Sequence, residues 1–237
     1  MTRRVLRPEQ CLEKVRQALQ VCPEISVVGI AGPGDTLATD HALTTFLLIH
    51  QEFPDLIKCM STNGLMLARR ADEVVRAGVS TVTVTINGVD PAIVAMVVSS
   101  VRWNGRVLSG REAAETLIEQ QLLGIRSMAA RNVLVKINTV LIPGVNDRHI
   151  GEIAKSVAPI GAFRINIISL IPQHDMVNLP APSCQQLREA RVAAERYLPV
   201  FRHCKHCRAD AVGVPGLHQD ISAMLYDEPI AATFSHG

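Results

Sequence analysis

The chain has 237 residues, of which 48% are hydrophobic and 19% are charged, and its formal net charge is +2. This composition excludes a disordered chain, which combines low hydrophobicity with high net charge. The small positive charge argues against electrostatic binding of nucleic acid. The longest stretch without Asp, Glu, Lys or Arg covers 13 residues, 77–89, whereas a membrane-spanning helix needs roughly 20 apolar residues. The first ten residues lead into a polar, helix-like segment without an apolar signal region. We expect a cytoplasmic protein that binds neither membrane nor nucleic acid.

Short β-branched runs alternate with amphipathic segments along the chain, as in βα units around a parallel sheet. The predicted strands are nearly continuously apolar, which is typical of strands covered on both faces. In chain order they are Ile25–Ala31, Leu56–Ser61, Thr81–Asn87, Val133–Leu141 and Phe163–Ile171. Five predicted helices are Glu9–Gln20, Ala42–Gln51, Leu65–Ala77, Pro91–Val98 and Ala113–Ala130. A sixth is capped by Asn146 and Asp147 and runs through Val157, and a seventh is capped by Ser183 and runs through Tyr197.

Two of these helices begin with a capping-box pattern, Ser109 with Glu112 and Ser183 with Gln186. Five strands are fewer than the eight of a complete barrel, so both a partial barrel and an open doubly wound sheet fit the pattern. Without repeats or linkers, we expect one α/β core over residues 1–208, followed by an irregular tail over 209–237.

Small, amide and hydroxyl side chains follow nearly every predicted strand. The positions of interest are Gly32, Gly34, Asp35, Asn63, Thr85, Asn87 and Asn138. Parallel α/β folds bind ligands at the carboxyl ends of their strands, and glycine lets a ligand approach the backbone closely. Each motif taken singly is also explained by turn formation, but their repetition on one rim favours a ligand site.

Cys204 and Cys207 have the Cys-x-x-Cys spacing of a pair that holds one metal or iron–sulfur cluster. The flanking Arg202, Lys205 and Arg208 would lower the thiol pKa values and offset cluster charge. A zinc site, a redox dithiol and two structural cysteines are the alternatives.

The other four cysteines stand singly. By itself, Cys59 is best interpreted as a small buried hydrophobe. We predict no functional role for Cys11, Cys22 or Cys184.

Six motifs in this order carry a family resemblance: Val28–Asp35, Cys59–Leu65, Val82–Asn87, Gly110–Ala114, Val135–Asp147 and Arg202–Ala211. Together they resemble the NifB family of radical S-adenosylmethionine proteins, which act in nitrogenase cofactor biosynthesis, from about Leu6 to Gly213. The resemblance implies a partial (βα) barrel of parallel strands that binds S-adenosylmethionine across the strand ends. It also implies radical cleavage of that cofactor at a four-iron cluster, and fusion of two further four-iron clusters around a carbide into an eight-iron precursor.

Carried over by position, Gly32, Gly34 and Asp35 would face the methionine amino group. Asn63, Thr85, Asn87 and Asn138 complete the expected cofactor site, and Thr85, Asn87 and Asn138 would contact the remainder of the cofactor. Cys204 and Cys207 would ligate one substrate cluster and Cys59 would contribute to the other, so the resemblance changes the interpretation of Cys59 from core residue to ligand. The implied partners are an iron–sulfur cluster donor and downstream cofactor-assembly proteins.

One departure from the family concerns its Cys-x-x-x-Cys-x-x-Cys motif, which binds the cluster that cleaves the cofactor and which these 237 residues do not contain. The family's first strand and cysteine loop are therefore expected to be missing, and the chain alone is expected not to cleave S-adenosylmethionine. Two functions follow: an N-terminally truncated maturase, or a non-catalytic paralogue that binds an iron–sulfur cluster or S-adenosylmethionine.

Overall fold

The computed structural model describes residues 6–32, 34–202, 212–213 and 225. Cys204 and Cys207, and nearly all of the predicted tail, lie outside the described residues. The chain divides into two compact units. Unit 1 comprises Met1–Thr62, Arg70–Val82 and His203–Gly237, and unit 2 comprises Asn63–Arg69 and Thr83–Arg202.

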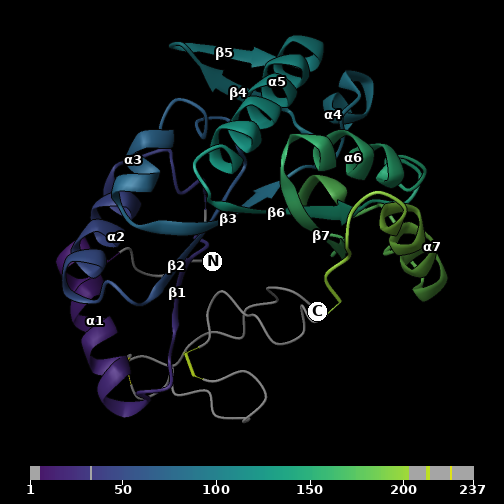
Figure 1. Cartoon of the computed structure of the whole chain (residues 1–237). Helices are drawn as coiled ribbons and strands as arrows, with labels where there is room; N and C mark the ends of the chain where they lie inside the picture. The colour runs from purple at the N-terminus through teal and green to yellow at the C-terminus, as the bar shows by residue number, and fades with distance from the viewer. Residues whose placement is uncertain (1–5, 33, 203–211, 214–224, 226–237) are drawn as a thin grey trace. The chain divides into compact units, whose positions relative to one another are not determined.

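The long strands form one five-stranded sheet with the order β1-β2-β3-β6-β7 (Figure 1). They are β1 (Val27–Ile30), β2 (Ile57–Thr62), β3 (Val79–Thr85), β6 (Leu134–Leu141) and β7 (Ala162–Ser169). The first half of β3 belongs to unit 1 and its last three residues belong to unit 2. The pairs β1–β2 and β6–β7 are parallel. All five predicted strands are therefore confirmed, each to within two residues at either end.

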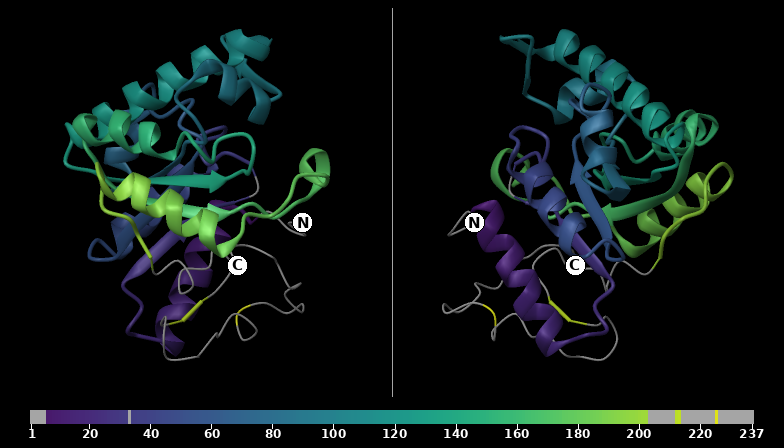
Figure 2. Two further views of the ribbon diagram at one scale, coloured as in Figure 1. Left: turned by 90° about the vertical axis from the view of Figure 1, so that its right-hand side faces the viewer. Right: turned by 60° about the vertical axis from the view of Figure 1, so that its left-hand side comes forward.

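In unit 1, α1 (Pro8–Val21), α2 (His41–Glu52) and the short α3 (Ala71–Arg76) accompany β1 and β2, and α1 packs along α2 (Figures 1 and 2). One face of β2 is covered, because Lys58, Met60 and Thr62 are buried while the intervening residues are only partly buried or exposed. Lys58, which is 1% exposed, donates from Nζ to the carbonyl oxygens of Phe53 and Pro54 at 2.8 and 2.9 Å, at the end of α2. This buried lysine therefore ties β2 to the helix that precedes it.

In unit 2, α5 (Gly110–Ala129), α6 (Ile150–Val157) and α7 (Cys184–Glu195) accompany β6 and β7, and α4 (Pro91–Val97) packs against α5 (Figure 1). Along β6, Val135, Ile137, Thr139 and Leu141 are buried on one face. The intervening Lys136, Asn138 and Val140 are partly buried on the other face. The two short 3-10 helices are Ala158–Ile160 and His174–Met176.

A hairpin that the sequence analysis did not predict follows α4. Its strands β4 (Ser100–Trp103) and β5 (Arg106–Ser109) are antiparallel. They are joined by Asn104 and Gly105, which both have positive φ, 50° and 77°, as a tight two-residue hairpin turn requires. Val101 and Leu108 from the hairpin join a small core with Ala113 and Leu117 of α5.

The predicted helix Leu65–Ala77 is wrong over its first half, because only Ala71–Arg76 is helical. Leu65 and Leu67 are buried, but in turns rather than along a helical stripe. Gly64 lies between them and Asn63 with φ of +86°, and a Cβ there would lie 2.9 Å from side-chain atoms of Gln121 and Val84. A tight glycine turn therefore replaces the first turns of the predicted helix.

Two predicted helix caps also need correction, whereas a third is confirmed. Ser109 occupies the N-cap position of α5 but its side chain makes no capping hydrogen bond. Asn146 does not cap α6, whose N-cap is His149. The capping box of Ser183 and Gln186 at α7 is present with both reciprocal bonds.

Among the described residues no helix, the 20-residue α5 included, combines the length and apolarity of a membrane span.

Candidate functional site

In unit 1 the loop after β1 is fastened to the end of β2 through Asp35. The Thr62 hydroxyl donates to both carboxylate oxygens, at 3.0 Å to Oδ1 and 2.8 Å to Oδ2. The Leu37 N–H donates to Asp35 Oδ1 at 2.9 Å, which makes an Asx turn. The Thr36 hydroxyl donates to the Ser61 carbonyl oxygen at 2.6 Å. The predicted ligand Asp35 is thus held at the carboxyl ends of β1 and β2.

The two predicted glycines of the same loop leave its backbone open. Gly32 and Gly34 are exposed, and a Cβ built at either position would meet no heavy atom within 4 Å. Gly34 has φ of +82°, a conformation that side-chain-bearing residues rarely adopt. The loop therefore presents unobstructed backbone beside the Asp35 carboxylate, which suits close approach of a polar ligand.

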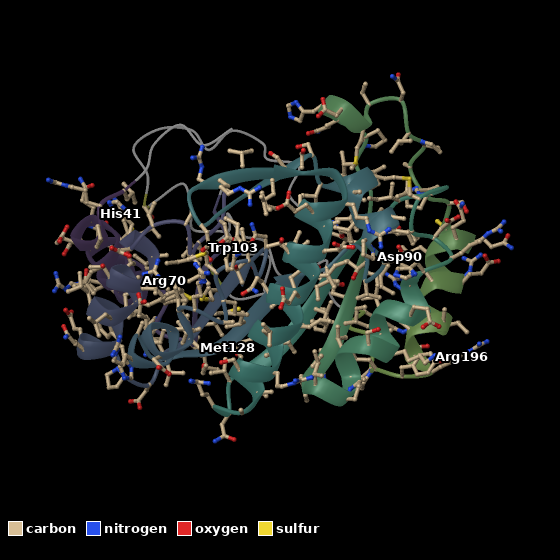
Figure 3. The ribbon with its side chains drawn as sticks, turned by 90° about the horizontal axis from the view of Figure 1, so that it is seen from above. His41, Arg70, Asp90, Trp103, Met128 and Arg196 are labelled. Atoms are coloured by element: carbon tan, nitrogen blue, oxygen red, sulfur yellow. The ribbon has the colours of Figure 1, made fainter. Side chains whose placement is uncertain are left out.

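Arg70, labelled in Figure 3, holds the second half of this loop. Its guanidinium donates to the carbonyl oxygens of Leu37 and Thr39 at 3.1 and 2.9 Å. It also pairs with Asp40 and Glu73 at 2.7 and 2.6 Å, with only 11% of its side chain exposed. Sequence reasoning missed Arg70, because only the Glu73 pairing has a sequence signal, an i,i+3 spacing.

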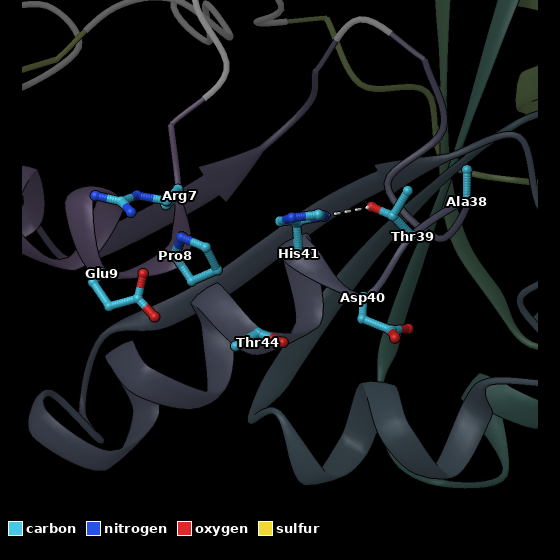
Figure 4. Close-up of a pocket in the computed structure, with 8 residues that line it drawn as sticks. All are labelled: Arg7, Pro8, Glu9, Ala38, Thr39, Asp40, His41 and Thr44. Carbon is cyan, nitrogen blue, oxygen red and sulfur yellow. Dashed lines mark hydrogen bonds between the residues drawn. The ribbon is translucent and has the colours of Figure 1, made fainter.

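A hollow of about 620 Å³ opens where α1 and α2 begin (Figure 4). None of the predicted cofactor-binding residues lines it. Its lining residues are Arg7, Pro8, Glu9, Ala38, Thr39, Asp40, His41 and Thr44. Charges of both signs surround the hollow, and one of its carboxylates, Asp40, is already paired with Arg70.

Cys59 lies on β2 opposite Gly29 of β1. It is partly buried and belongs to the less covered face of the strand, whereas its neighbours Lys58 and Met60 are buried on the other face. The interpretation of Cys59 as a fully buried core residue does not fit this placement. A partly buried thiol on that face has the accessibility that a ligand requires.

In unit 2 the side chain of the predicted residue Asn63 forms an Asx turn with the backbone two residues further along. Its Oδ1 accepts the Leu65 N–H at 2.8 Å. Its carbonyl oxygen accepts from Gln121 Nε2 at 2.7 Å, and the same nitrogen donates to the Thr85 carbonyl oxygen at 2.9 Å. Gln121, 4% exposed on α5, is therefore the residue that ties the turn to the end of β3. Its only signal in the sequence is that of one polar residue on an apolar helix face.

Asn87 and Asn146 link the end of β3 to the end of β6. Asn87 Oδ1 accepts the Val140 N–H at 2.9 Å. Asn146, 0% exposed, accepts the Ile142 N–H at 2.8 Å and donates to the carbonyl oxygens of Asn87 and Val140 at 3.0 and 2.8 Å. The Ile-Pro-Gly-Val-Asn-Asp motif thus has a structural role, because Asn146 closes the turn after β6.

Asn138 and Thr85 retain donors for a ligand. Asn138 of β6 faces Asn166 of β7, whose Nδ2 donates to Asn138 Oδ1 at 2.8 Å. Within the described part of the chain, neither Asn138 Nδ2 nor the Thr85 hydroxyl makes a hydrogen bond. Both side chains are partly buried. They can therefore bind a polar ligand without losing an existing bond.

The predicted residues thus divide between the units. Gly32, Gly34, Asp35 and Cys59 belong to unit 1, and Asn63, Thr85, Asn87 and Asn138 belong to unit 2. Their union in one cofactor site stays a prediction. Among residues 6–32 and 34–202, His, Cys, Asp and Glu form no group of three or more that is arranged to hold a metal.

Comparison with known proteins identifies the family. The model of the radical SAM superfamily matches residues 2–157. The FeMo cofactor biosynthesis protein NifB of Methanocaldococcus infernus is 43% identical over 210 residues, covering 89% of this chain and 69% of that protein. The chain belongs to the NifB family of radical SAM proteins. NifB of Klebsiella pneumoniae is 45% identical over 219 residues, and this NifB-family chain spans 47% of its length.

Solved structures agree on the fold. A radical SAM methyltransferase from Sphaerobacter thermophilus superposes with a TM-score of 0.60 at 18% identity, covering 84% of this chain and 58% of that chain. Hydroxymethylglutaryl-CoA lyase from Pseudomonas aeruginosa superposes with a TM-score of 0.54 at 12% identity, covering 84% of this chain and 60% of that chain. At such identities only the fold is shared. The parallel sheet of this NifB-family chain is thereby confirmed as a partial α/β barrel of radical-SAM type.

Proposed function

We propose that the chain acts in nitrogenase cofactor biosynthesis as the cofactor- and substrate-holding part of a NifB-type maturase. The reaction fuses two four-iron clusters, as substrates, into an eight-iron precursor with a carbide from the methionine methyl group. The observation that carries this proposal is 43–45% identity to proteins named NifB over 89–90% of the chain. An iron–sulfur cluster donor and downstream cofactor-assembly proteins are the proposed partners.

Each unit carries residues whose chemistry suits part of S-adenosylmethionine. In unit 1, Gly32 and Gly34 offer open backbone, and Asp35 is a carboxylate suited to an ammonium group. In unit 2, the Asn138 amide and the Thr85 hydroxyl have donors to spare. The bound cofactor, with a reducing four-iron cluster, supplies the methyl group and the radical chemistry. This chain's residues bind and orient it.

Cys59, Cys204 and Cys207 are the proposed ligands of the substrate clusters. The structure describes the segment that leads to the cysteine pair as far as Arg202. Val200 forms a parallel bridge with Ile165 of β7, so the chain there runs towards the carboxyl ends of the strands. Cys204 and Cys207 themselves lie outside the described residues, so their assignment rests on the family resemblance of the motif Arg202–Ala211.

Cofactor binding tests the proposal through Asn138→Asp. This variant keeps an acceptor for Asn166 Nδ2 but removes the two Nδ2 donors. We expect S-adenosylmethionine to bind the anaerobically prepared chain in equilibrium dialysis, and Asn138→Asp to bind roughly tenfold more weakly. Gln185→Ala, at an exposed site on α7, is the matched control. Equal affinity of Asn138→Asp and the control would refute the assignment of Asn138.

A second experiment separates the maturase from a non-catalytic binding protein. The expected result is that deleting the coding region from its host stops formation of the nitrogenase cofactor, and that the wild-type gene restores it. The paralogue alternative predicts bound cofactor or cluster in the purified protein together with unchanged nitrogenase cofactor in the deletion strain. No binding and no effect of deletion would contradict both functions.

A further inference from the structure

The crossover between β3 and β6 carries a hairpin that takes no part in the five-stranded sheet. Between these two strands the chain forms α4, then β4 and β5, and then α5. The strands β4 and β5 make a separate two-stranded sheet, which lies beside α5 and apart from β6 and β7 (Figure 1). Connections that carry additional structure are common places for binding functions. The hairpin is therefore a candidate for a role of its own.

The inner face of the hairpin is anchored to the helices of unit 2. Val101 and Leu108 face each other across the two strands and are 8% and 5% exposed. They belong to the same small core as Val94 of α4 and as Ala113 and Leu117 of α5. The outer residues of the hairpin are thus presented from a packed base, and a preorganised surface binds a partner at a lower entropic cost.

The outer edge of β4 has backbone groups available for a further strand. Trp103 and Arg106 close the two-residue turn, and the residue pairs of an antiparallel ladder alternate between hydrogen-bonded and open pairs. The next pair, Arg102 with Val107, is therefore open, and the Arg102 N–H and carbonyl oxygen point away from β5. Within the part of the chain that the structure describes, neither group bonds to another segment. Such an edge is a template for strand addition.

Unpaired positive charge gathers at β4. Arg102 is exposed, and its guanidinium pairs with no carboxylate among the described residues. Arg69 pairs with none of them either, and its guanidinium carbon lies 3.7 Å from the ring centroid of Trp103. On β5, by contrast, Arg106 pairs with Glu112 at 3.4 Å. The uncompensated charge therefore belongs to β4 rather than to β5.

The charges indicate which kind of strand fits this edge. A second copy of the chain, added antiparallel along β4, would bring one Arg102 close to the other, and like charges on neighbouring strands are unfavourable. A strand with carboxylate side chains would instead pair with Arg102. The small formal net charge of the chain, +2, argues against a general attraction of nucleic acid. The edge therefore favours an acidic extended segment of another protein.

We propose that β4 is a docking site for an acidic extended segment of a partner protein, which adds to the hairpin as a third strand. Main-chain hydrogen bonds to Arg102 supply affinity, and the charges of Arg102 and Arg69 select acidic over basic segments. The site lies within unit 2 and uses none of the residues assigned to the cofactor or to the clusters. It is therefore independent of the proposed function.

The test uses the full chain and two synthetic peptides of about ten residues, one alternating Glu with Thr and the other alternating Lys with Thr. Trp103 is the only tryptophan of the chain, so its fluorescence reports binding at the hairpin. We expect the acidic peptide to change this fluorescence saturably and the basic peptide to leave it unchanged. Arg102→Glu replaces attraction by repulsion and should weaken binding of the acidic peptide roughly tenfold. Arg188→Glu, at an exposed position on α7, makes the same change of charge and should bind as the wild type does.

Amide hydrogen exchange followed by NMR distinguishes strand addition from a purely ionic contact. On binding of the acidic peptide, exchange of the Arg102 N–H should slow, whereas exchange of the Val107 N–H, on the opposite edge of the hairpin, should not change. Equal affinity of Arg102→Glu and Arg188→Glu for the acidic peptide would overturn the proposal, and so would unchanged exchange at Arg102. Tighter binding of a single-stranded oligonucleotide than of the acidic peptide would make the partner a nucleic acid and would also overturn it. A concentration-dependent dimer in sedimentation velocity that Arg102→Glu abolishes would assign β4 to a second copy of the chain instead.

Discussion

The Asn146 side chain fastens the loop after β6 from a fully buried position, so its removal should be felt by the whole of unit 2. It makes three hydrogen bonds, one accepted and two donated, all with backbone groups. Asn146→Ala leaves the Ile142 N–H and two carbonyl oxygens without this partner. At about 1 kcal/mol for each bond, the expected loss in the free energy of unfolding is about 3 kcal/mol. In a protein of this size, that corresponds to a decrease in Tm of about 6 to 12 °C.

Thermal and urea unfolding followed by circular dichroism measure this loss. Asn178→Ala, at an exposed position, is the matched control and should change the free energy of unfolding by less than about 0.5 kcal/mol. Asn146→Asp keeps the acceptor for Ile142 but turns an anionic oxygen towards two carbonyl oxygens. It should therefore destabilise at least as much as Asn146→Ala. A loss below about 1 kcal/mol for Asn146→Ala would show that water or backbone movement replaces the three bonds, and would refute the structural role.

Three further predictions concern other parts of the chain. Lys58→Met removes three hydrogen bonds of one buried ammonium group, two to carbonyl oxygens and one at 3.2 Å to His50 Nδ1. We expect the free energy of unfolding, measured in urea, to fall by about 2 kcal/mol. A change within experimental error would contradict the proposed tie between β2 and α2. Burial lowers the pKa of His149 from its ordinary value of 6.5, and its Nε2 accepts the Val89 N–H at 3.1 Å. Just below pH 6.5 the unfolded chain therefore binds more protons, so the free energy of unfolding should fall as the pH is lowered through this window. His149→Gln, which does not titrate, should flatten the dependence, and an equally steep profile would contradict the assignment. Finally, these 237 residues alone, reconstituted and reduced with dithionite, should form no 5′-deoxyadenosine from S-adenosylmethionine; product above a no-protein blank would overturn this.

The order of strands and most helices could be predicted from the sequence, because their signals are local. Continuous β-branched runs, such as the one that forms β6, are recognisable without knowledge of their neighbours. The Ser183–Gln186 capping box involves one turn of chain and was confirmed in full. The Asn104-Gly105 hairpin signal is equally local, yet β4 and β5 were not predicted.

Other assignments depended on contacts between distant segments. The amide of Asn146 has the same chemistry as a helix cap and as a buried clamp, and only the approach of Asn87 and Val140 decides between them. The family motifs carried a residue-by-residue expectation for Asp35 and Asn138. The sequence could not show that Thr62 holds the first while Asn166 leaves the donors of the second unused.

The pairing of Lys136 with Arg164 is the clearest case that only the tertiary structure decided. The two residues are 28 positions apart, and their side chains share a face because of one extra residue, Phe163, in β7. A single-residue bulge reverses which face every later side chain occupies, and alternation within either strand does not reveal it. Hydrophobic periodicity therefore determined that β6 and β7 would form. Their register, which comes from packing one strand against the other, decided which charges would meet.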